Sequence, residues 1–169
     1  AYFQVKHQAD KEFIVHAGKI SVTVLGTSFD VSAFSDDPKV AVSLKEGKVL
    51  VEAGEHGENK QQNALLEPGE QAIFTKSTAI LNVDNLNPKV SFGWETQDIF
   101  FENADIDEVL RKLQRYYGVT FDTGLLKKRH WHLTGEYKNE TLAEVLESLS
   151  FNYNLKYRIE GRRVVLYEP

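Results

Sequence analysis

The sequence contains no cysteine and no methionine among its 169 residues. Without cysteine the chain cannot form a disulfide, bind a metal through thiolate or use a thiol as a nucleophile, and its redox compartment cannot be inferred. No apolar run approaches the ~20 residues that cross a bilayer, and the amino end has no signal-peptide pattern. Because an initiator methionine is also missing, we expect this sequence to be a piece of a longer protein.

Basic residues are in slight deficit, with 20 Lys and Arg against 25 Asp and Glu. A nucleic-acid-binding surface normally needs a basic face, so this balance argues against a nucleic-acid partner. The charges are also unevenly divided along the chain. Residues 1–98 contain no arginine and 14 acidic residues, whereas residues 99–169 carry 11 charges of each sign. This break in composition predicts two domains.

The first domain, residues 1–88, is predicted to be all-β, either a rolled sheet or a sandwich. Apolar residues alternate with Ser and Thr from Ile20 to Val24, the period of two that half-buried strands show. Residues 40–44 and 48–51 flank a glycine-containing turn at Gly47, which predicts a hairpin. Pro68-Gly69 suits a type II turn, because proline presets φ and glycine accepts a positive φ.

Two further segments complete the organisation of the chain. The polar stretch from Glu55 to Asn63 is predicted to be a loop. Residues 89–98 are predicted to link the first domain to a second domain over residues 99–169.

The second domain is predicted to be α+β with duplicated βαβ units. One amphipathic helix begins after Asp105 as N-cap and ends before Gly118, and another begins after Thr141. At an offset of 36 residues the two stretches match, as Tyr117 does with Tyr153, and such a period indicates a duplicated unit. We therefore expect one shared sheet with both helices on one face. A hairpin at Gly161 is predicted to leave an edge strand near the carboxyl end.

The sequence contains no motif of a known catalytic or cofactor site. His130 and His132 could ligate a metal together, since residues two apart on a strand share a face. A third ligand is not in view, because the remaining histidines all belong to the other domain: His7, His16 and His56. A plain exposed strand is the favoured reading. We therefore predict no metal, no cofactor and no enzymatic activity.

Acidic and glycosylation-like patterns also have simpler explanations. Asp36-Asp37 and the pair Asp105 and Asp107 could in principle carry acid-base chemistry, but turn and helix-cap roles account for them. The sequence Asn139-Glu-Thr matches a glycosylation sequon, yet it also reads as the start of a helix, which we favour.

The sharpest charge feature is a segment of six consecutive residues: Lys127, Lys128, Arg129, His130, Trp131 and His132. We call it the basic segment. It could bind nucleic acid through phosphate contacts and a stacking ring, but one such cluster in a neutral domain competes poorly in salt. A solvated loop is the plainest interpretation. The strongest functional interpretation is an acidic protein partner, for which Trp and Arg are favoured anchors.

Several motifs in order along the chain resemble the FecR family of anti-sigma regulators, in particular the periplasmic portion of its Bacteroidetes-type members. The matching segments are residues 1–5, 13–15, 24–34, 42–49, 66–71, Trp94, 101–103, 109–119 and 133–137. This resemblance implies an all-β FecR-type domain followed by a domain like the secretin and TonB short N-terminal fold.

The resemblance also implies a place in signalling. Family members look like single-pass inner-membrane proteins whose cytoplasmic segment holds an extracytoplasmic-function sigma factor. In such systems a TonB-dependent outer-membrane transporter, often SusC-like, extends a signalling domain that touches the periplasmic region. By this resemblance we expect the chain to be a periplasmic interaction module without a small-molecule substrate.

The family pattern normally begins earlier, with an Asp-Gly-Thr turn and an Arg-x-Val segment. We therefore expect that the sigma-binding segment, the membrane helix and several strands precede Ala1. Two alternatives stay open from the sequence: a carbohydrate-binding or carbohydrate-processing module, and a subunit of a secretin-like envelope assembly. Within the regulator interpretation, the basic segment is the predicted partner-binding surface, with Trp131 as anchor.

Overall fold

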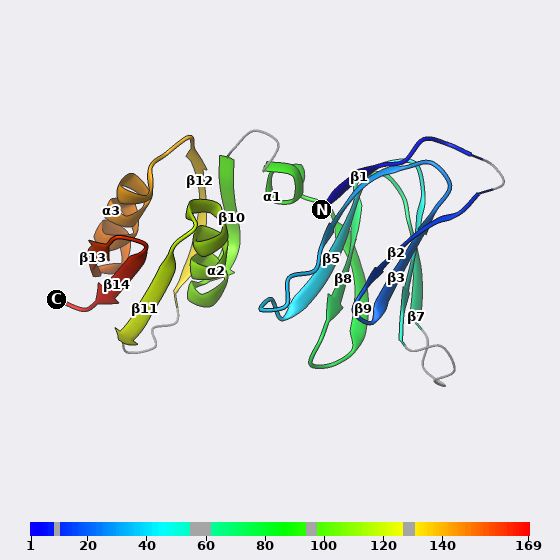
Figure 1. The fold of residues 1–169 in the computed structure, drawn as a ribbon. Coiled ribbons are helices and arrows are strands. Elements are labelled where there is room, and N and C mark those ends of the chain that lie inside the picture. Colours follow the sequence, from blue (N-terminus) through cyan, green and yellow to red (C-terminus); the bar gives the residue numbers. More distant parts are fainter. Residues whose placement is uncertain (9–10, 55–61, 94–97, 127–130) are drawn as a thin grey trace. The chain divides into compact units, whose positions relative to one another are not determined.

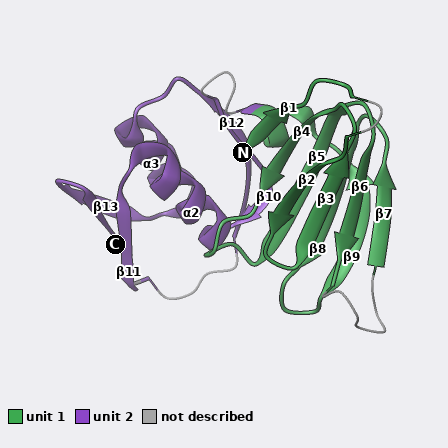
Figure 2. Cartoon of the chain, turned by 45° about the vertical axis from the view of Figure 1, so that its right-hand side comes forward, with its two compact units in different colours: residues 1–92 green, residues 93–169 purple. Residues whose placement is uncertain are grey.

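The computed structural model describes residues 1–8, 11–54, 62–93, 98–126 and 131–169 (Figure 1). The chain divides into two compact units, residues 1–92 and residues 93–169 (Figure 2). The boundary between them falls inside the predicted linker, residues 89–98. Within the described ranges, no helix is long and apolar enough to cross a bilayer.

The first unit is built from two antiparallel sheets. In spatial order, one sheet contains β1 (Tyr2–Gln4), β4 (Ser28–Ser32), β5 (Lys39–Glu46), β8 (Glu70–Thr75) and β9 (Ile80–Asn85). The other contains β2 (Phe13–Ala17), β3 (Ile20–Val24), β6 (Val49–Ala53) and β7 (Gln62–Leu66). The only helix in the described part of this unit is α1 (Pro88–Phe92). The unit thus has the sandwich-like, β-rich character that the alternating pattern predicts.

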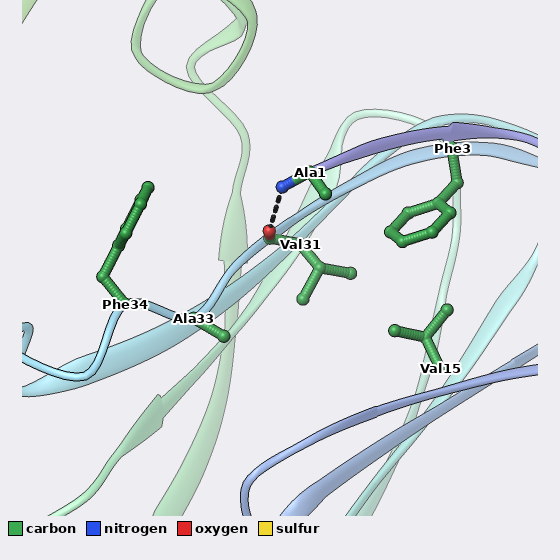
Figure 3. Close-up of a pocket in the computed structure, with 6 residues that line it drawn as sticks. All are labelled: Ala1, Phe3, Val15, Val31, Ala33 and Phe34. Carbon is green, nitrogen blue, oxygen red and sulfur yellow. Dashed lines mark hydrogen bonds between the residues drawn. The ribbon is translucent and has the colours of Figure 1, made fainter. Parts of the chain in front are cut away.

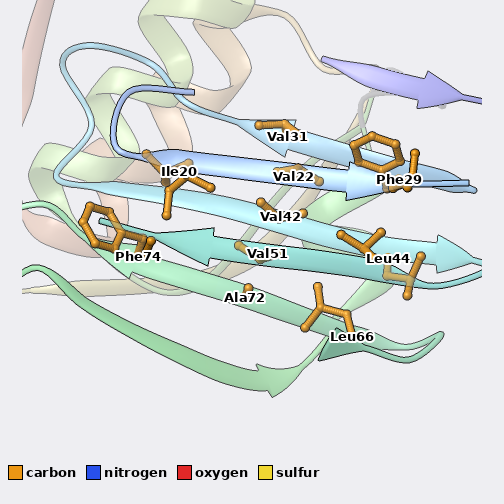
Figure 4. Packing of buried hydrophobic residues seen from close by; sticks show 14 residues of the cluster. Ile20, Val22, Phe29, Val31, Val42, Leu44, Val51, Leu66, Ala72 and Phe74 are labelled. Atoms are coloured by element: carbon orange, nitrogen blue, oxygen red, sulfur yellow. The ribbon is translucent and has the colours of Figure 1, made fainter. Parts of the chain in front are cut away.

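The core of the first unit lies between its two sheets (Figure 4). In β3, Ile20, Val22 and Val24 are buried, while the Ser and Thr between them are half-buried. Facing residues from the other sheet include Phe29 and Leu44, which are fully buried. Because each strand buries alternate side chains, the pattern read from the sequence gives the correct inward face.

The predicted hairpin around Gly47 is wrong. Strand β5 pairs with β4 and β8, whereas β6 pairs with β3 and β7, so the chain passes from one sheet to the other at this point. Gly47 has φ 95°, and a Cβ placed on it would lie 2.8 Å from the carbonyl oxygen of Gly26. The Thr27 hydroxyl donates to the Lys48 carbonyl at 3.0 Å. Alternation shows which residues are inside but not whether successive strands pair or cross between sheets.

The predicted turn at Pro68-Gly69 is confirmed. The Glu70 N–H donates to the Glu67 carbonyl at 3.0 Å, and Gly69 at the third position has φ 91°. Of the polar stretch predicted to be a loop, residues 55–61 lie outside the described residues. Its last two residues, Gln62 and Asn63, begin β7.

Helix α1 packs on the outer side of the larger sheet of the first unit. The Ser91 and Ser43 hydroxyl oxygens are 3.1 Å apart. The Phe92 ring meets Tyr2 edge-on at 6.3 Å between centroids, and the Lys45 ammonium lies 5.4 Å from the Phe92 ring. Part of the predicted linker is therefore ordered against the first unit.

The second unit alternates strands and helices. Its elements are β10 (Asp98–Asp105), α2 (Ile106–Tyr117), β11 (Thr120–Leu125), β12 (His132–Lys138), α3 (Leu142–Tyr153), β13 (Lys156–Glu160) and β14 (Arg163–Tyr167). The two helices are both 12 residues long. They begin 36 residues apart, which is the period read from the sequence.

Both helices have the predicted caps. The Asp105 carboxylate accepts a hydrogen bond from the Glu108 N–H, and Thr141 forms a capping box with Glu144. These bonds satisfy N–H groups that a helix start otherwise leaves without a partner. At the opposite ends, Gly118 and its counterpart Asn154 both take a left-handed conformation.

The single shared sheet predicted for the second unit is wrong. Strands β10 and β12 form a two-stranded antiparallel sheet, and a separate three-stranded sheet has the order β11-β14-β13. In the latter, β11 runs parallel to β14 and β13 forms the predicted hairpin with it. The last strand is therefore central, and the edge strand near the carboxyl end is β13.

The two helices contact both sheets instead of lying on one face of a single sheet. Val109 and Leu113 of α2 belong to a buried cluster with β10 and β12, as do Val145 and Leu149 of α3. One residue further along each helix, Leu110 and Leu146 pack against Val164 and Leu166 of β14. Each helix thus has two adjacent rows of apolar side chains. One row packs against β10 and β12 and the other against β14, so the broad apolar stripe seen in the sequence contributes to two cores instead of one.

Candidate interaction surface

The basic segment connects β11 to β12 in the second unit. Its first four residues, Lys127, Lys128, Arg129 and His130, lie outside the described residues. Trp131 lies immediately before β12, and His132 is the first residue of that strand. The structure therefore locates the carboxyl end of this predicted surface and the strand that holds it.

Trp131 is half-buried and anchored within its own unit. Its ring stacks on Tyr153 at 4.0 Å between centroids, with an angle of 19° between the planes, and it borders the buried cluster around β10 and β12. Stacked aromatic pairs add stability beyond the area that they bury. Trp131 thus has a structural role besides any contact with a partner, and one side of its ring is already covered.

His132 is exposed and holds an irregularity in the neighbouring strand. Its Nδ1 lies 3.2 Å from the carbonyl oxygen of Asn103, and the Thr134 hydroxyl accepts from the Asn103 N–H at 2.9 Å. Asn103 has φ 48°, at a shift in the β10–β12 register between Phe101 and Ala104. The side chains of β12 therefore fix a bulge in β10, as bulges of defined geometry require.

Two tyrosines at matching places in the repeat carry hydrogen bonds across the unit. The Tyr117 hydroxyl donates to the Glu140 carbonyl at 2.7 Å, and the Tyr153 hydroxyl donates to the His132 carbonyl at 2.9 Å. Burial and the nearby carboxylates raise the pKa of Tyr117 to about 12. Burial also raises the pKa of Tyr153. Both phenols therefore stay protonated as donors at neutral pH.

The sequence pairs these tyrosines through the 36-residue period but gives no sign of what their hydroxyls bind. Their partners are main-chain carbonyls, which carry no signal in residue identity. The period itself was the only clue to their common role.

No group of three or more His, Asp or Glu side chains converges within the described ranges. Of the histidines considered as ligands, His130 and His56 lie outside the described residues. Asp105 has the N-cap role that was favoured for it. The Asn139 residue of the sequon-like pattern has φ 51° just before α3.

The first unit has a shallow apolar hollow between the edge strands β1 and β2 (Figure 3). It is lined by Ala1, Phe3, Val15, Val31, Ala33 and Phe34. The polar contact drawn within it is the Ala1 amine donating to the Val31 carbonyl at 2.6 Å. None of the lining side chains can transfer a proton or act as a nucleophile, so we assign the hollow no catalytic role.

Among the described residues, three of the four edge strands of the second unit have a side-chain hydrogen bond to their main chain. Lys112, whose pKa burial lowers, donates to the Phe100 carbonyl of β10 at 2.7 Å. Tyr153 binds the first carbonyl of β12, as described above. In β11, the Asp122 carboxylate accepts from the Gly124 N–H at 3.0 Å, at a shift in the register between β11 and β14. Edge strands protected in this way are poor templates for a further strand.

Known proteins similar to this chain agree with the resemblance seen in its motifs. The family profile "FecR protein" matches residues 1–50, and "FecR, C-terminal" matches residues 98–166. Two crystal structures of a candidate anti-sigma factor from Parabacteroides distasonis ATCC 8503 superpose with TM-scores of 0.87 and 0.85. In both, sequence identity is 29%, and the match covers 99% of this chain and 76% of that one. No curated protein matches the sequence.

Proposed function

The chain belongs to the FecR family of anti-sigma factors, which has a signalling role, and we propose that it is the periplasmic signalling module of a transmembrane member. In this proposal it relays the substrate occupancy of a TonB-dependent outer-membrane transporter to an extracytoplasmic-function sigma factor. The transporter's signalling domain docks on the second unit, for which the family resemblance implies a fold like the secretin and TonB short N-terminal domain. The sigma factor binds a cytoplasmic segment beyond this chain, across the inner membrane.

The observation that carries this proposal is that the carboxyl end of the basic segment is attached to the folded second unit. Trp131 is held by Tyr153, and His132 is held by its pairing in β12 and by its contact with Asn103. The carboxyl end of the basic segment is therefore fixed to a folded unit. Its last residue, His132, is exposed to solvent. A fixed surface loses less conformational entropy on binding than a free loop does.

The charges of the basic segment suit an acidic partner. Lys127, Lys128 and Arg129 add three positive charges within three residues. Charges at the rim of an interface mainly increase the association rate and select the partner. A half-buried tryptophan beside them can contribute the central apolar contact that many interfaces need. We assign the three cations to steering and Trp131 to anchoring.

The test is isothermal titration of the chain with the signalling domain of the transporter encoded beside it. Arg129→Glu combined with Trp131→Phe keeps an aromatic ring on Tyr153 and should weaken binding about tenfold. Lys39→Glu, at an exposed position in β5 of the first unit, changes the net charge equally and should leave the affinity unchanged. Unchanged affinity in the double variant would remove the basic segment from the interface.

A further inference from the structure

Strand β13 is the edge of the second unit whose main chain has no side-chain hydrogen bond within the described part of the chain. It pairs only with β14. Unlike β10, β11 and β12, its main chain has no hydrogen bond to a side chain among the residues that the structure describes. Proteins usually block such edges to prevent pairing with other chains. Within the described residues β13 has only its charged side chains for this purpose, Lys156, Arg158 and Glu160, and the main-chain groups of its outer edge stay accessible.

The hairpin geometry shows which main-chain groups are free. Glu160 pairs with Arg163 across a two-residue turn, and in such hairpins the flanking pair exchanges both main-chain bonds. Alternate residues repeat this pattern, so Arg158 also bonds to β14. The N–H and C=O groups of Tyr157 and Ile159 are then directed to the open edge.

The side chains of β13 differ on its two faces. Tyr157 packs against the cluster formed by the helices and β14, and Ile159, on the same face, is 42% exposed. The other face carries Lys156 and Arg158, and Arg158 is paired with Glu160 at 2.8 Å. Lys156 has no ion-pair partner among the described residues. The edge is therefore apolar on one face and has an unpaired cation on the other.

We infer that β13 accepts an extended acidic segment of a partner protein as an additional strand of the three-stranded sheet. The added strand has apolar side chains toward Ile159 and carboxylates toward Lys156. Strand addition of this kind takes affinity from main-chain bonds and selectivity from alternate side chains. This inference deepens the proposed function, on which it rests for the identity of the partner but not for the chemistry of the edge.

A second copy of this chain is the alternative occupant of this edge. If β13 paired with itself about its central residue, Arg158 would lie opposite the same residue of the other copy, while Lys156 would lie opposite Glu160 in both directions. An acidic strand brings carboxylates to Lys156 and no cation to Arg158.

The probe is a short capped peptide in which valine alternates with glutamate, titrated into the whole chain. Amide hydrogen exchange followed by NMR should show slower exchange at Tyr157 and Ile159 when the peptide is present. A matched peptide with N-methyl groups along one edge cannot form the main-chain bonds and should leave both amides unprotected. A third peptide, with lysine in place of glutamate, should bind at least about tenfold more weakly, because it meets Lys156 with a like charge.

Two variants test the site from the side of the protein. Ile159→Pro removes an N–H that faces the open edge, a position where proline is tolerated, and should lower peptide affinity at least about tenfold. Ile159→Ala keeps that N–H and should retain most of the affinity. Lys156→Glu leaves the main chain unchanged and should invert the preference between the acidic and basic peptides, so it decides the matter even if the proline variant does not fold.

The outcomes separate this inference from the proposed function. If the N-methylated peptide binds equally well, or protection appears on another strand, the β13 assignment is overturned. Protection of Tyr157 and Ile159 that grows with protein concentration alone would replace the partner with a second copy. If the transporter's signalling domain binds but Ile159→Pro and Lys156→Glu do not weaken it, the proposed function stands and this inference fails. If the acidic peptide binds at β13 but the signalling domain does not bind the chain, this inference stands and the proposed function fails.

Discussion

The two units of this chain depend on different kinds of sequence information. In the first unit, strands far apart in sequence pair across two sheets, and the chain changes sheets where glycines allow close contact. In the second unit, each helix is delimited by residues immediately beside it, such as Asp105 and Thr141. The difference teaches that local capping rules describe the second unit well, whereas the first depends on contacts between distant turns.

The largest expected effect is at the crossing between the sheets of the first unit. Gly47→Ala should lower the free energy of unfolding by about 3 kcal/mol, because it combines an unfavourable positive φ with a collision against the Gly26 carbonyl. Urea unfolding, with hydrogen exchange to locate the change in the first unit, measures it. Gly69→Ala is the matched control, since Gly69 has φ 91° but nothing within 4 Å of the added Cβ. It should cost only about 1 kcal/mol, and equal losses would show that the collision is unimportant.

The next effect concerns the caps of the repeated helices. Thr141→Ala and Asp105→Ala should each lower the free energy of unfolding by about 1 kcal/mol, because each exposes an unsatisfied helical N–H. Glu147→Ala, at an exposed position within α3, is the control and should change stability by less than about 0.5 kcal/mol. Thermal or urea unfolding gives all three values. A cap variant that behaves like Glu147→Ala would show that the two helices do not rely on the same device.

A comparable effect with a distinctive pH dependence is expected at Tyr117. Tyr117→Phe removes the bond to the Glu140 carbonyl and should lower stability by about 1 kcal/mol at neutral pH. Because the pKa of Tyr117 is raised from 10.0 to about 12 in the folded protein, the unfolded chain loses this proton first. The stabilisation that comes from the raised pKa of Tyr117 is therefore complete below pH 10 and is lost as the pH rises toward 12.

Unfolding measured from pH 8 to pH 12 tests this pH dependence. The decline in stability above pH 10 should be shallower in Tyr117→Phe than in the unmodified chain. Tyr153→Phe should change the profile in the same direction, since burial raises that pKa as well. Parallel profiles for the unmodified chain and Tyr117→Phe would contradict the raised pKa.

The smallest effect is expected on the exposed face of the three-stranded sheet. The Gly124 N–H and the Arg163 guanidinium hold the pKa of Asp122 below its ordinary value. The stabilisation that comes from this lowered pKa is present when the pH is above the ordinary pKa of an aspartate. It is lost as the pH falls through the lower pKa of Asp122 in the folded protein. NMR titration of the carboxyl carbon measures the shift directly. Because the pair is exposed, Arg163→Gln should raise the pKa with little change in stability, and an unchanged pKa would show that the ion pair has no influence.

Much of the fold follows from the sequence, and the failures have a common cause. The buried face of β3, the turn at Gly69, the two helices and their caps were all predicted correctly, because each is decided by residues within one element. The hairpin at Gly47 and the shared sheet were predicted wrongly, because strand partners are chosen by packing between elements. For the candidate site, Trp131 was found as an aromatic residue beside charges, but its stacking on Tyr153 required the tertiary structure.

By itself the sequence determined the β-rich first unit, the 36-residue period, the helix ends and the family, since these depend on local spacing and on residue identity. Only the tertiary structure decided that the helices serve two sheets, that β14 is central and that β13 is left as an open edge. The physical reason is that side-chain periodicity specifies which face of a strand or helix is buried. The neighbour that covers this face is selected by the combined packing of the whole unit.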